Sequence, residues 1–350
     1  IPALDAHLVV FVNGEYSNEL SNSNLPEGIK VLALSEASAS DKDAMCEHLG
    51  MHINSENQAF NTLNTSYFKD VAFVKVDDNV EVNKPIHVLS LCVGGNQAVN
   101  MRNLIVLGAN SKANVITQFE GEGNTDSFTN VVSEVVVGDA AKGGLYIIQN
   151  EGETTSHINS TQVSQSNSSQ FSVITVTKSG KLVRNNLNYS VNGEGCESNM
   201  YGVYFTRDNQ HVDNHTYVDH LRPNCNSNEL YKGVMNDKST GVFNGKIMVQ
   251  REAQKTNAFQ SNQNILLSDT ASIFTKPELE IYADDVKCSH GCTVGQLDDE
   301  ATFYLQSRGL SKDDATKLLI QAFASDVMEK VEMEALRDSL ETFIHNQFAV

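Results

Sequence analysis

The residues best suited to chemistry lie near the C-terminus, in the segment KCSHGC at positions 287–292. On an extended strand, Cys288, His290 and Cys292 would point to one face, with neighbours about 6.6 Å apart. Thiolate and imidazole are ligands that suit iron or zinc. Because one strand cannot wrap three ligands around a tetrahedral metal, we expect at most two of them to bind it, with a partner chain completing the site. The local chemistry alone favours the alternative, a buried cysteine pair beside a hydrogen-bonded histidine.

A second group of candidate ligands is a histidine cluster around Asp213 and Asp219, made of His211, His215 and His220. The β-branched and aromatic residues between the histidines favour a strand. On a strand, His211 and His215 share one face and His220 takes the other. We expect polar groups that are satisfied within one turn of the fold, rather than a metal site.

The sequence lacks the motifs of several enzyme classes. It contains no Walker A motif, no GxSxG elbow and no HExxH motif. The pair Gly143-Gly144 has no strand–loop–helix setting for phosphate binding, so we predict a turn there. The adjacent acids Asp298 and Asp299 fit a helix cap better than acid catalysis on a sugar. Four cysteines have no metal-ligand spacing and are predicted to be core or surface thiols: Cys46, Cys92, Cys196 and Cys225.

The elements that must position these residues are mostly strands. From about Ala72 to Ile281, short strand-like runs recur about every ten to twelve residues, separated by Gly, Asn, Asp and Ser. No helix of ordinary length fits between most of them, which excludes βαβ units. Asparagines on the strands themselves, which can form ladders, and turns with few prolines favour a β-solenoid. The pattern by itself does not decide between a solenoid and a sandwich or barrel.

Both ends of the chain have a different pattern. The first 70 residues predict a strand in LVVFVNG, a helix starting at Ser40-Asp41 and a short helix from Phe60 to Phe68. From Asp298 two or three amphipathic helices follow, one of them with a capping box at Ser311. Their apolar faces must bury against the β body, each other or a partner. We therefore expect a mixed α/β segment (1–70), a β core (71–297) and a C-terminal helical domain (298–350).

Composition narrows the functional classes. The 350 residues carry a formal net charge of −19, which argues against nucleic acid and anionic membranes as partners. No apolar run reaches the roughly 18–20 residues that span a bilayer. The first residues lack the cationic stretch of a signal peptide. Six sparse cysteines then predict free thiols in a reducing cytoplasm.

Two long segments carry a family resemblance. Residues 275–310, TKPELEIYADDVKCSHGCTVGQLDDEATFYLQSRGL, and residues 213–269, from DNHTYVDHL to NILLSD, closely resemble the signature of the SufB/SufD family of iron–sulfur cluster assembly scaffold proteins. RNLIVLG from Arg102 agrees, and the likeness covers roughly Leu63 to Val327. It implies a mainly β protein, a right-handed parallel β-helix with a C-terminal α-helical domain. Family members usually carry a helical segment before the β body, and we expect part of it to be missing here.

The resemblance also implies a function and partners. It implies a non-catalytic scaffold in a cytoplasmic complex with a SufB-like paralogue and a SufC-like ABC ATPase. ATP would act only through that ATPase. The paralogue would pair along the β-helix end near the signature. The ATPase would dock on the C-terminal helices, through Leu318, Leu319, Phe323 and Val327.

The signature suggests where the chemistry takes place. Ser289-His290-Gly291 points to the SufD branch of the family. His290 corresponds to a histidine proposed to lie at the SufB interface, where a transient Fe–S cluster forms with a SufB cysteine, so His290 is the candidate metal ligand. Cys288 corresponds to a common cysteine of that branch, whereas Cys292 stands where the family usually has alanine. Cluster type, flavin binding to the complex and homodimer formation by the isolated chain are left open.

Two other functions compete with this one. A carbohydrate-active β-helix enzyme, such as a polysaccharide lyase, would need clustered acids in a cleft and an export signal. A purely structural partner would stabilise the paralogue without contacting the cluster.

Overall fold

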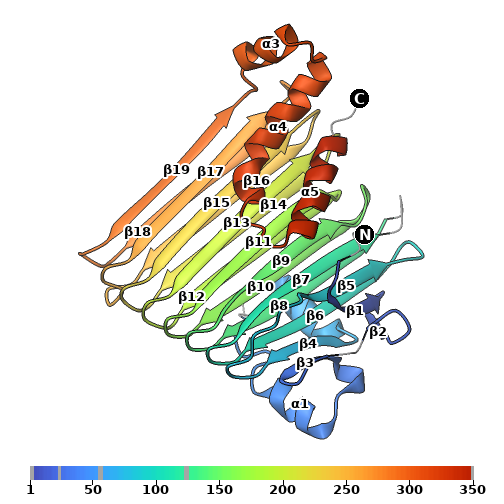
Figure 1. Cartoon of the computed structure of the whole chain (residues 1–350), viewed down its shortest axis with the longest axis vertical. Helices are drawn as coiled ribbons and strands as arrows, with labels where there is room; N and C mark the ends of the chain where they lie inside the picture. Colours follow the sequence, from blue (N-terminus) through green and yellow to red (C-terminus); the bar gives the residue numbers. More distant parts are fainter. Residues whose placement is uncertain (1–3, 23–24, 54–57, 122–125, 348–350) are drawn as a thin grey trace.

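The chain forms a parallel β-solenoid in which successive strands alternate between two sheets (Figure 1). The computed structural model describes residues 4–22, 25–53, 58–121 and 126–347. From β4 onward the odd-numbered strands build one sheet and the even-numbered strands the other, and every pairing among them is parallel. The predicted series of short strands is therefore confirmed. A solenoid, and not a sandwich or a barrel, is the architecture.

The ten-stranded sheet comprises, in spatial order, β2 (Glu15–Ser17), β1 (His7–Val12), β5 (Ile86–Cys92), β7 (Lys112–Gly121), β9 (Lys142–Asn150), β11 (Gln170–Ser179), β13 (Glu197–Thr206), β15 (Asn226–Met235), β17 (Asn257–Leu266) and β19 (Lys287–Gly295). The nine-stranded sheet comprises β3 (Ile29–Ala33), β4 (Val71–Val76), β6 (Ala98–Leu107), β8 (Phe128–Val137), β10 (Ser156–Gln165), β12 (Leu182–Val191), β14 (His211–His220), β16 (Thr240–Val249) and β18 (Ser272–Ile281). The helices are η1 (Leu34–Glu36), α1 (Ala39–Cys46), α2 (Ala59–Tyr67), α3 (Asp299–Ser307), α4 (Lys312–Met328) and α5 (Glu334–Gln347).

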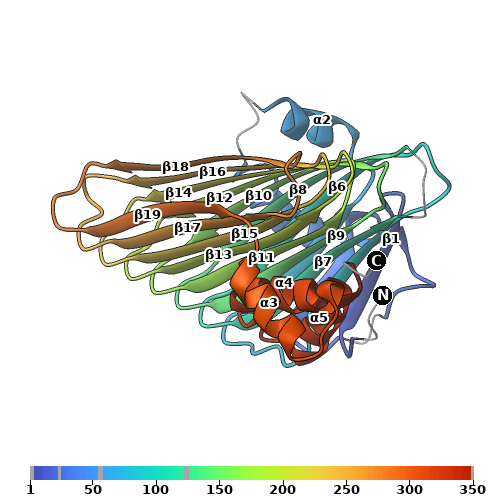
Figure 2. The ribbon, with the colours of Figure 1, turned by 90° about the horizontal axis from the view of Figure 1, so that it is seen from above.

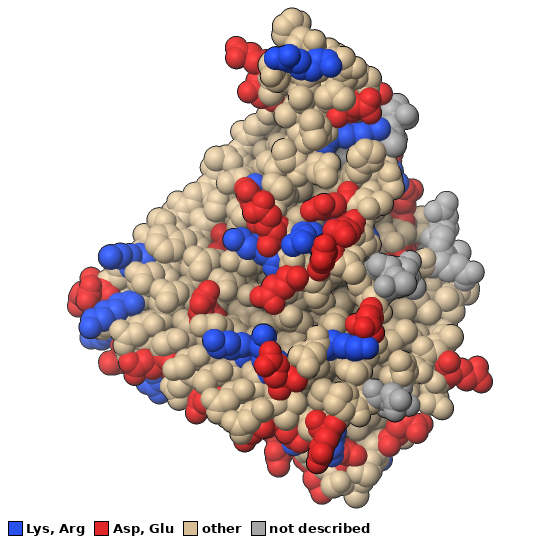
Figure 3. All heavy atoms as spheres, viewed as in Figure 1, with Lys and Arg blue, Asp and Glu red and all other residues tan. Residues whose placement is uncertain are grey.

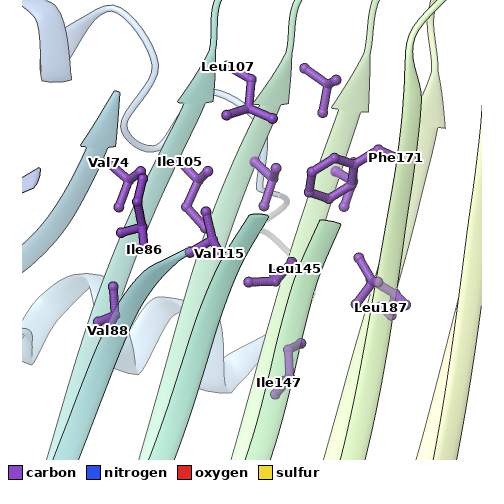
Figure 4. Packing of buried hydrophobic residues seen from close by; sticks show 14 of the residues in the cluster. Val74, Ile86, Val88, Ile105, Leu107, Val115, Leu145, Ile147, Phe171 and Leu187 are labelled. Atoms are coloured by element: carbon purple, nitrogen blue, oxygen red, sulfur yellow. The ribbon is translucent and has the colours of Figure 1, made fainter. Parts of the chain in front are cut away.

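The core lies between the two sheets. Side chains alternate along each strand, so every second residue faces inward, and in-register neighbours from successive turns stack in columns. Ile86, Val115 and Leu145 form part of one such column, on β5, β7 and β9 (Figure 4). Burial of these apolar columns is the main stabilising contribution.

The turns also stack. Asn110 and Ala140 have positive φ, and each donates its N–H to a carbonyl of the next turn, those of Asp139 and Asn167. Asparagine tolerates this left-handed conformation better than most residues, which explains its frequency between the strands.

The predicted turn at Gly143-Gly144 is wrong, because both residues lie in β9. A Cβ at Gly143 would lie 2.0 Å from the carbonyl oxygen of Ala113 on the neighbouring strand β7. Here glycine permits close approach of two strands and does not mark a turn.

An N-terminal segment covers the outer face of the first strands of the nine-stranded sheet. The predicted helices are confirmed as α1, whose N-cap is Ser38, and as α2. The buried Asn64 of α2 donates its amide N–H groups to the carbonyls of Met101 and Asn130, at 2.8 and 2.9 Å. β1 pairs in parallel with β5 and so extends the ten-stranded sheet.

The C-terminal helices pack on the opposite side of the solenoid from α2 (Figure 2). The predicted caps at Asp298 and Ser311 are confirmed at the starts of α3 and α4. Apolar residues of α4 and α5 pack on outward-facing residues of the ten-stranded sheet, including Ile320, Val327 and Leu340 on one side and Val203, Phe205 and Val234 on the other. None of the described helices is long and apolar enough to cross a bilayer.

Candidate functional site

The segment KCSHGC lies in β19, the last strand of the ten-stranded sheet, so the strand on which the sequence argument depended is present. Among the described strands β19 pairs only with β17, and Cys288, His290 and Cys292 lie in register with Ala258, Gln260 and Asn262. These three partners are buried inside the solenoid. The two cysteines and the histidine therefore share the inward-facing side of the final turn, as the alternation predicts.

No further turn of the described chain stacks on the final turn. Cys288 is half-buried, whereas His290 and Cys292 are exposed. The alternative of a buried cysteine pair beside a hydrogen-bonded histidine is thus wrong, because the last inward face is open. Burial raises the pKa of the Cys288 thiol.

β18 ends the other sheet in the same way. Among the described strands it pairs with β16 alone, and it carries Pro277, a residue that has no backbone N–H and is typical of edge strands. Large apolar side chains are exposed around this open end, among them Phe259, Phe274, Tyr282 and Val294. Figure 1 shows both last strands at the same end of the solenoid.

The histidine cluster forms β14 with the predicted alternation. His211 and His215 face outward, and His215 Nε2 lies 3.0 Å from Asp213 Oδ1 on the same strand. His220 faces inward and shares a 2.9 Å hydrogen bond with Ser227 Oγ, and burial lowers its pKa to about 4. The expectation of locally paired polar groups is confirmed for His215 and for His220 Nε2, whereas the buried His220 Nδ1 has no hydrogen-bond partner among the described residues.

The described residues contain no complete metal site. In residues 4–22, 25–53, 58–121 and 126–347, no three His, Cys, Asp or Glu side chains are arranged to hold an ion. Cys288 and His290 could supply two ligands from one strand, and the remaining ligands would have to come from elsewhere. Of the other cysteines, Cys92, Cys196 and Cys225 are buried and Cys46 is exposed, so the prediction of core or surface thiols is confirmed.

The four predicted docking residues of α4 differ in accessibility. Leu318 is 46% exposed, and Leu319 and Phe323 are half-buried. Phe323 lies under the Lys232 ammonium, 4.7 Å from ring centroid to Nζ. Val327 is fully buried against the sheet, so it cannot contact a partner in this arrangement.

Sequence reasoning did not select the most exposed apolar residues of this region for docking. α3 buries no residue, and its Phe303 is 72% exposed. Figure 1 shows α3 beyond the sheet. Leu310 and Leu318 line a hollow of about 280 Å³ with Gln321 and His345. The signal that could have identified them is the amphipathic pattern of α3, because its apolar side had been assigned to no docking surface.

The surface charge is mixed. On the face viewed in Figure 3, acidic and basic side chains are interspersed, and no extended basic patch is visible among the residues shown.

Comparison with known proteins places this architecture in a family. A model described as "SUF system FeS cluster assembly, SufBD core domain" matches residues 91–323, and one for the SufBD protein N-terminal region matches residues 1–88. An iron–sulfur cluster assembly SufBD family protein of Synechocystis is 33% identical over 97% of this chain and 77% of its own length. The iron–sulfur cluster assembly protein SufD of Escherichia coli is 30% identical over 96% and 78%, and that of Bacillus subtilis 26% over 79% and 64%. The protein therefore belongs to the SufBD family of iron–sulfur cluster assembly proteins.

Proposed function

We propose that the chain is a SufD-type scaffold subunit of a cytoplasmic SUF complex. It pairs with a SufB-like paralogue, docks a SufC-like ABC ATPase and helps to build and transfer nascent Fe–S clusters. It has no catalytic activity of its own, and ATP acts only through the ATPase. Family membership and the two relatives named SufD support this assignment, as does Ser289-His290-Gly291 in the signature.

The observation that carries the proposal is the open end of the solenoid. β18 and β19 present unpaired backbone N–H and C=O groups, and such edges pair readily with another chain. The exposed Phe274 and Val294 beside them supply apolar surface for an interface. A right-handed β-helix of the paralogue would continue both sheets across this end.

His290 and Cys288 then lie where the two subunits meet. Imidazole and thiolate bind iron, and alternate positions on one strand leave space for ligands from a second subunit. In this proposal a SufB cysteine completes the site, and the iron and sulfide of the transient cluster are cargo. Of the two candidate ligands, His290 is the better supported, because the half-burial of Cys288 disfavours its thiolate form.

The ATPase docks on the C-terminal helices. Leu318 at the hollow beside Leu310, together with Phe303 and Tyr304 on α3, offers exposed apolar side chains on elements that project from a rigid body. Leu319 and Phe323 contribute their exposed parts. Val327 instead anchors α4 to the sheet.

The test is co-expression with both partners and an assay of iron and sulfide in the purified complex. His290→Ala is expected to lower cluster formation several-fold, and Ser289→Ala, on the outward side of the same strand, to leave it unchanged. An unchanged yield with His290→Ala would reject the chemical role and leave a purely structural partner. The mass of the isolated chain decides whether it forms a homodimer when the paralogue is absent.

A carbohydrate-active enzyme is not supported by a comparable observation. The outer face of the nine-stranded sheet has a polar hollow of about 270 Å³, lined in part by Arg184, His215 and Lys246. Arg184 pairs with Asp213 and Lys246 with Glu280. Glu278, the acid among the described residues that line the hollow, pairs with Lys276 at 2.8 Å, so the hollow does not present the clustered free acids that such an enzyme would need.

A further inference from the structure

The column of inward-facing residues that ends at His290 changes character near the open end. In-register neighbours in such a column are about 4.8 Å apart. The first five are apolar and the last three are polar: Ile86, Val115, Leu145, Val173, Met200, Glu229, Gln260 and His290. A polar group in a solenoid core carries a desolvation cost, so this change calls for a physical explanation.

Gln260 is held in a defined orientation beneath His290. Its side chain is 3% exposed, and its Nε2 donates a 2.7 Å hydrogen bond to Glu229 Oε2. When the Glu229 carboxyl is ionised it can only accept, so this bond then directs the amide nitrogen toward Glu229 and the amide oxygen away from it. The buried Gln260 Oε1 has no hydrogen-bond partner among the described residues. An unsatisfied buried acceptor keeps its desolvation cost uncompensated, so a donor that reaches Gln260 Oε1 would stabilise the final turns.

The opposite sheet leaves space for this amide. A Cβ at Gly245 of β16 would lie 2.3 Å from Gln260 Nε2 and 2.9 Å from Thr216 Oγ1. Any side chain there would displace Gln260 or strain the core. Glycine at position 245 thus leaves the space that the side-chain amide of Gln260 occupies.

We propose that Gln260 is a positioning residue for His290: its amide oxygen accepts the N–H of one imidazole nitrogen and turns the lone pair of the other toward the partner subunit. The two residues are in register on adjacent strands and share one face. In the proposed geometry the exposed imidazole rotates about its side-chain bonds until its N–H meets the amide oxygen. The part of this inference that concerns the cluster rests on the proposed function.

The chemical reason is the behaviour of histidine as a ligand. A histidine binds metal as the neutral imidazole, and a hydrogen bond to its second nitrogen fixes the tautomer and the ring orientation. Loss of such an orienting partner typically lowers metal affinity about 10–100-fold. Glu229 acts one step further away, because it fixes which end of the Gln260 amide faces the histidine.

The first test reads the hydrogen bond itself, independently of any cluster. The full chain is labelled with ¹⁵N-histidine, and the ring nitrogen shifts report the tautomer of His290, assigned by its loss in His290→Ala. Gln260→Met removes the acceptor at nearly constant shape, and Gln260→Asn withdraws it by one methylene if the first variant fails to fold. Both are expected to shift His290 toward a mixture of tautomers. Gln263→Met, an outward-facing glutamine of the same strand, is the matched control and should change nothing. An unchanged His290 tautomer in a folded Gln260 variant overturns the proposal.

The second test uses the assembled complex. Gln260→Met is expected to reduce cluster loading about tenfold or more, and Gln263→Met to preserve it. If His290→Ala leaves loading intact, the proposed chemical role of His290 fails, while the tautomer measurement still decides the role of Gln260. If His290→Ala abolishes loading and Gln260→Met does not lower it, only the positioning role is rejected.

Discussion

Arg102 and Glu134 form a 2.5 Å ion pair whose side chains are 1% and 0% exposed. They extend outward from β6 and β8, beneath the N-terminal segment. Glu134 also accepts the backbone N–H groups of Gly50 and His52, at 2.8 and 3.0 Å. The carboxylate thus attaches the segment after α1 to the face of the sheet.

Removing one partner of this pair is expected to destabilise the fold strongly. In Glu134→Gln the Arg102 charge stays buried without its counter-ion, a loss of about 3–5 kcal/mol in the free energy of unfolding. Denaturant unfolding measures it. The exposed pair Lys112–Glu81 provides the control, because Glu81→Gln should leave the free energy of unfolding almost unchanged. Similar costs for the two variants would contradict the structural reading of the buried pair.

Gly245→Ala is expected to destabilise the chain by about 1–3 kcal/mol, since the added methyl overlaps Gln260 and Phe243. Gly295→Ala places the same methyl on β19, where no atom of the described residues lies within 4 Å apart from Gly295 and its two chain neighbours. Thermal unfolding of the two variants compares them directly. A melting temperature that falls equally in both would show that the cost comes from the strand backbone and not from the space at residue 245.

Two substitutions on α4 separate folding from docking. Val327→Asp places a charge against the sheet and is expected to detach α4, with a loss of several kcal/mol in stability. Leu318→Asp lies on the exposed side and should leave unfolding unchanged but weaken capture of the ATPase partner. Co-purification and denaturant melts of both variants measure these effects. If the Leu318→Asp variant still captures the ATPase partner fully, the docking surface does not include this part of α4.

Stability is expected to depend on pH through Glu229. Burial raises its pKa to about 7 from an ordinary 4.5, although the hydrogen bond from Gln260 acts in the opposite direction. Between these two values the folded chain binds a proton that the unfolded chain lacks, so the free energy of unfolding falls as pH rises through this window. One pKa unit corresponds to about 1.4 kcal/mol, which makes the effect on the order of 3 kcal/mol.

The matched variant for this prediction is Glu229→Gln, which cannot titrate. Its stability relative to the parent chain should increase from about pH 5 to about pH 8, in urea unfolding series at each pH. A constant difference across that range would show that Glu229 does not titrate in the folded state near neutrality.

Sequence alternation predicted which residues of β14 and β19 share a face, because a period of two follows from backbone geometry alone. It could not predict that His290 and Cys292 are exposed. Their exposure depends on β19 being the last strand, and the local pattern of a last turn is the same as that of an inner one.

Helical periodicity likewise identified the apolar side of α4 but not what covers it. Val327 and Leu318 belong to one predicted stripe, yet the sheet buries the first and leaves the second exposed. The strand glycines show the same limit. Gly143 is in a strand because the backbone of β7 approaches it, and a contact between residues 30 positions apart has no signal in a single sequence.

In a solenoid each turn packs on the turn before it and the turn after it. The stability of the stack is therefore a sum of nearest-neighbour contributions. The turn formed by β18 and β19 has such a neighbour on one side only. Its amide hydrogens should therefore be among the first to exchange with solvent in the free chain. A subunit that binds there supplies the missing neighbour, and local melting of the last turn and association become linked equilibria. Part of the binding free energy is then spent on suppressing that fraying.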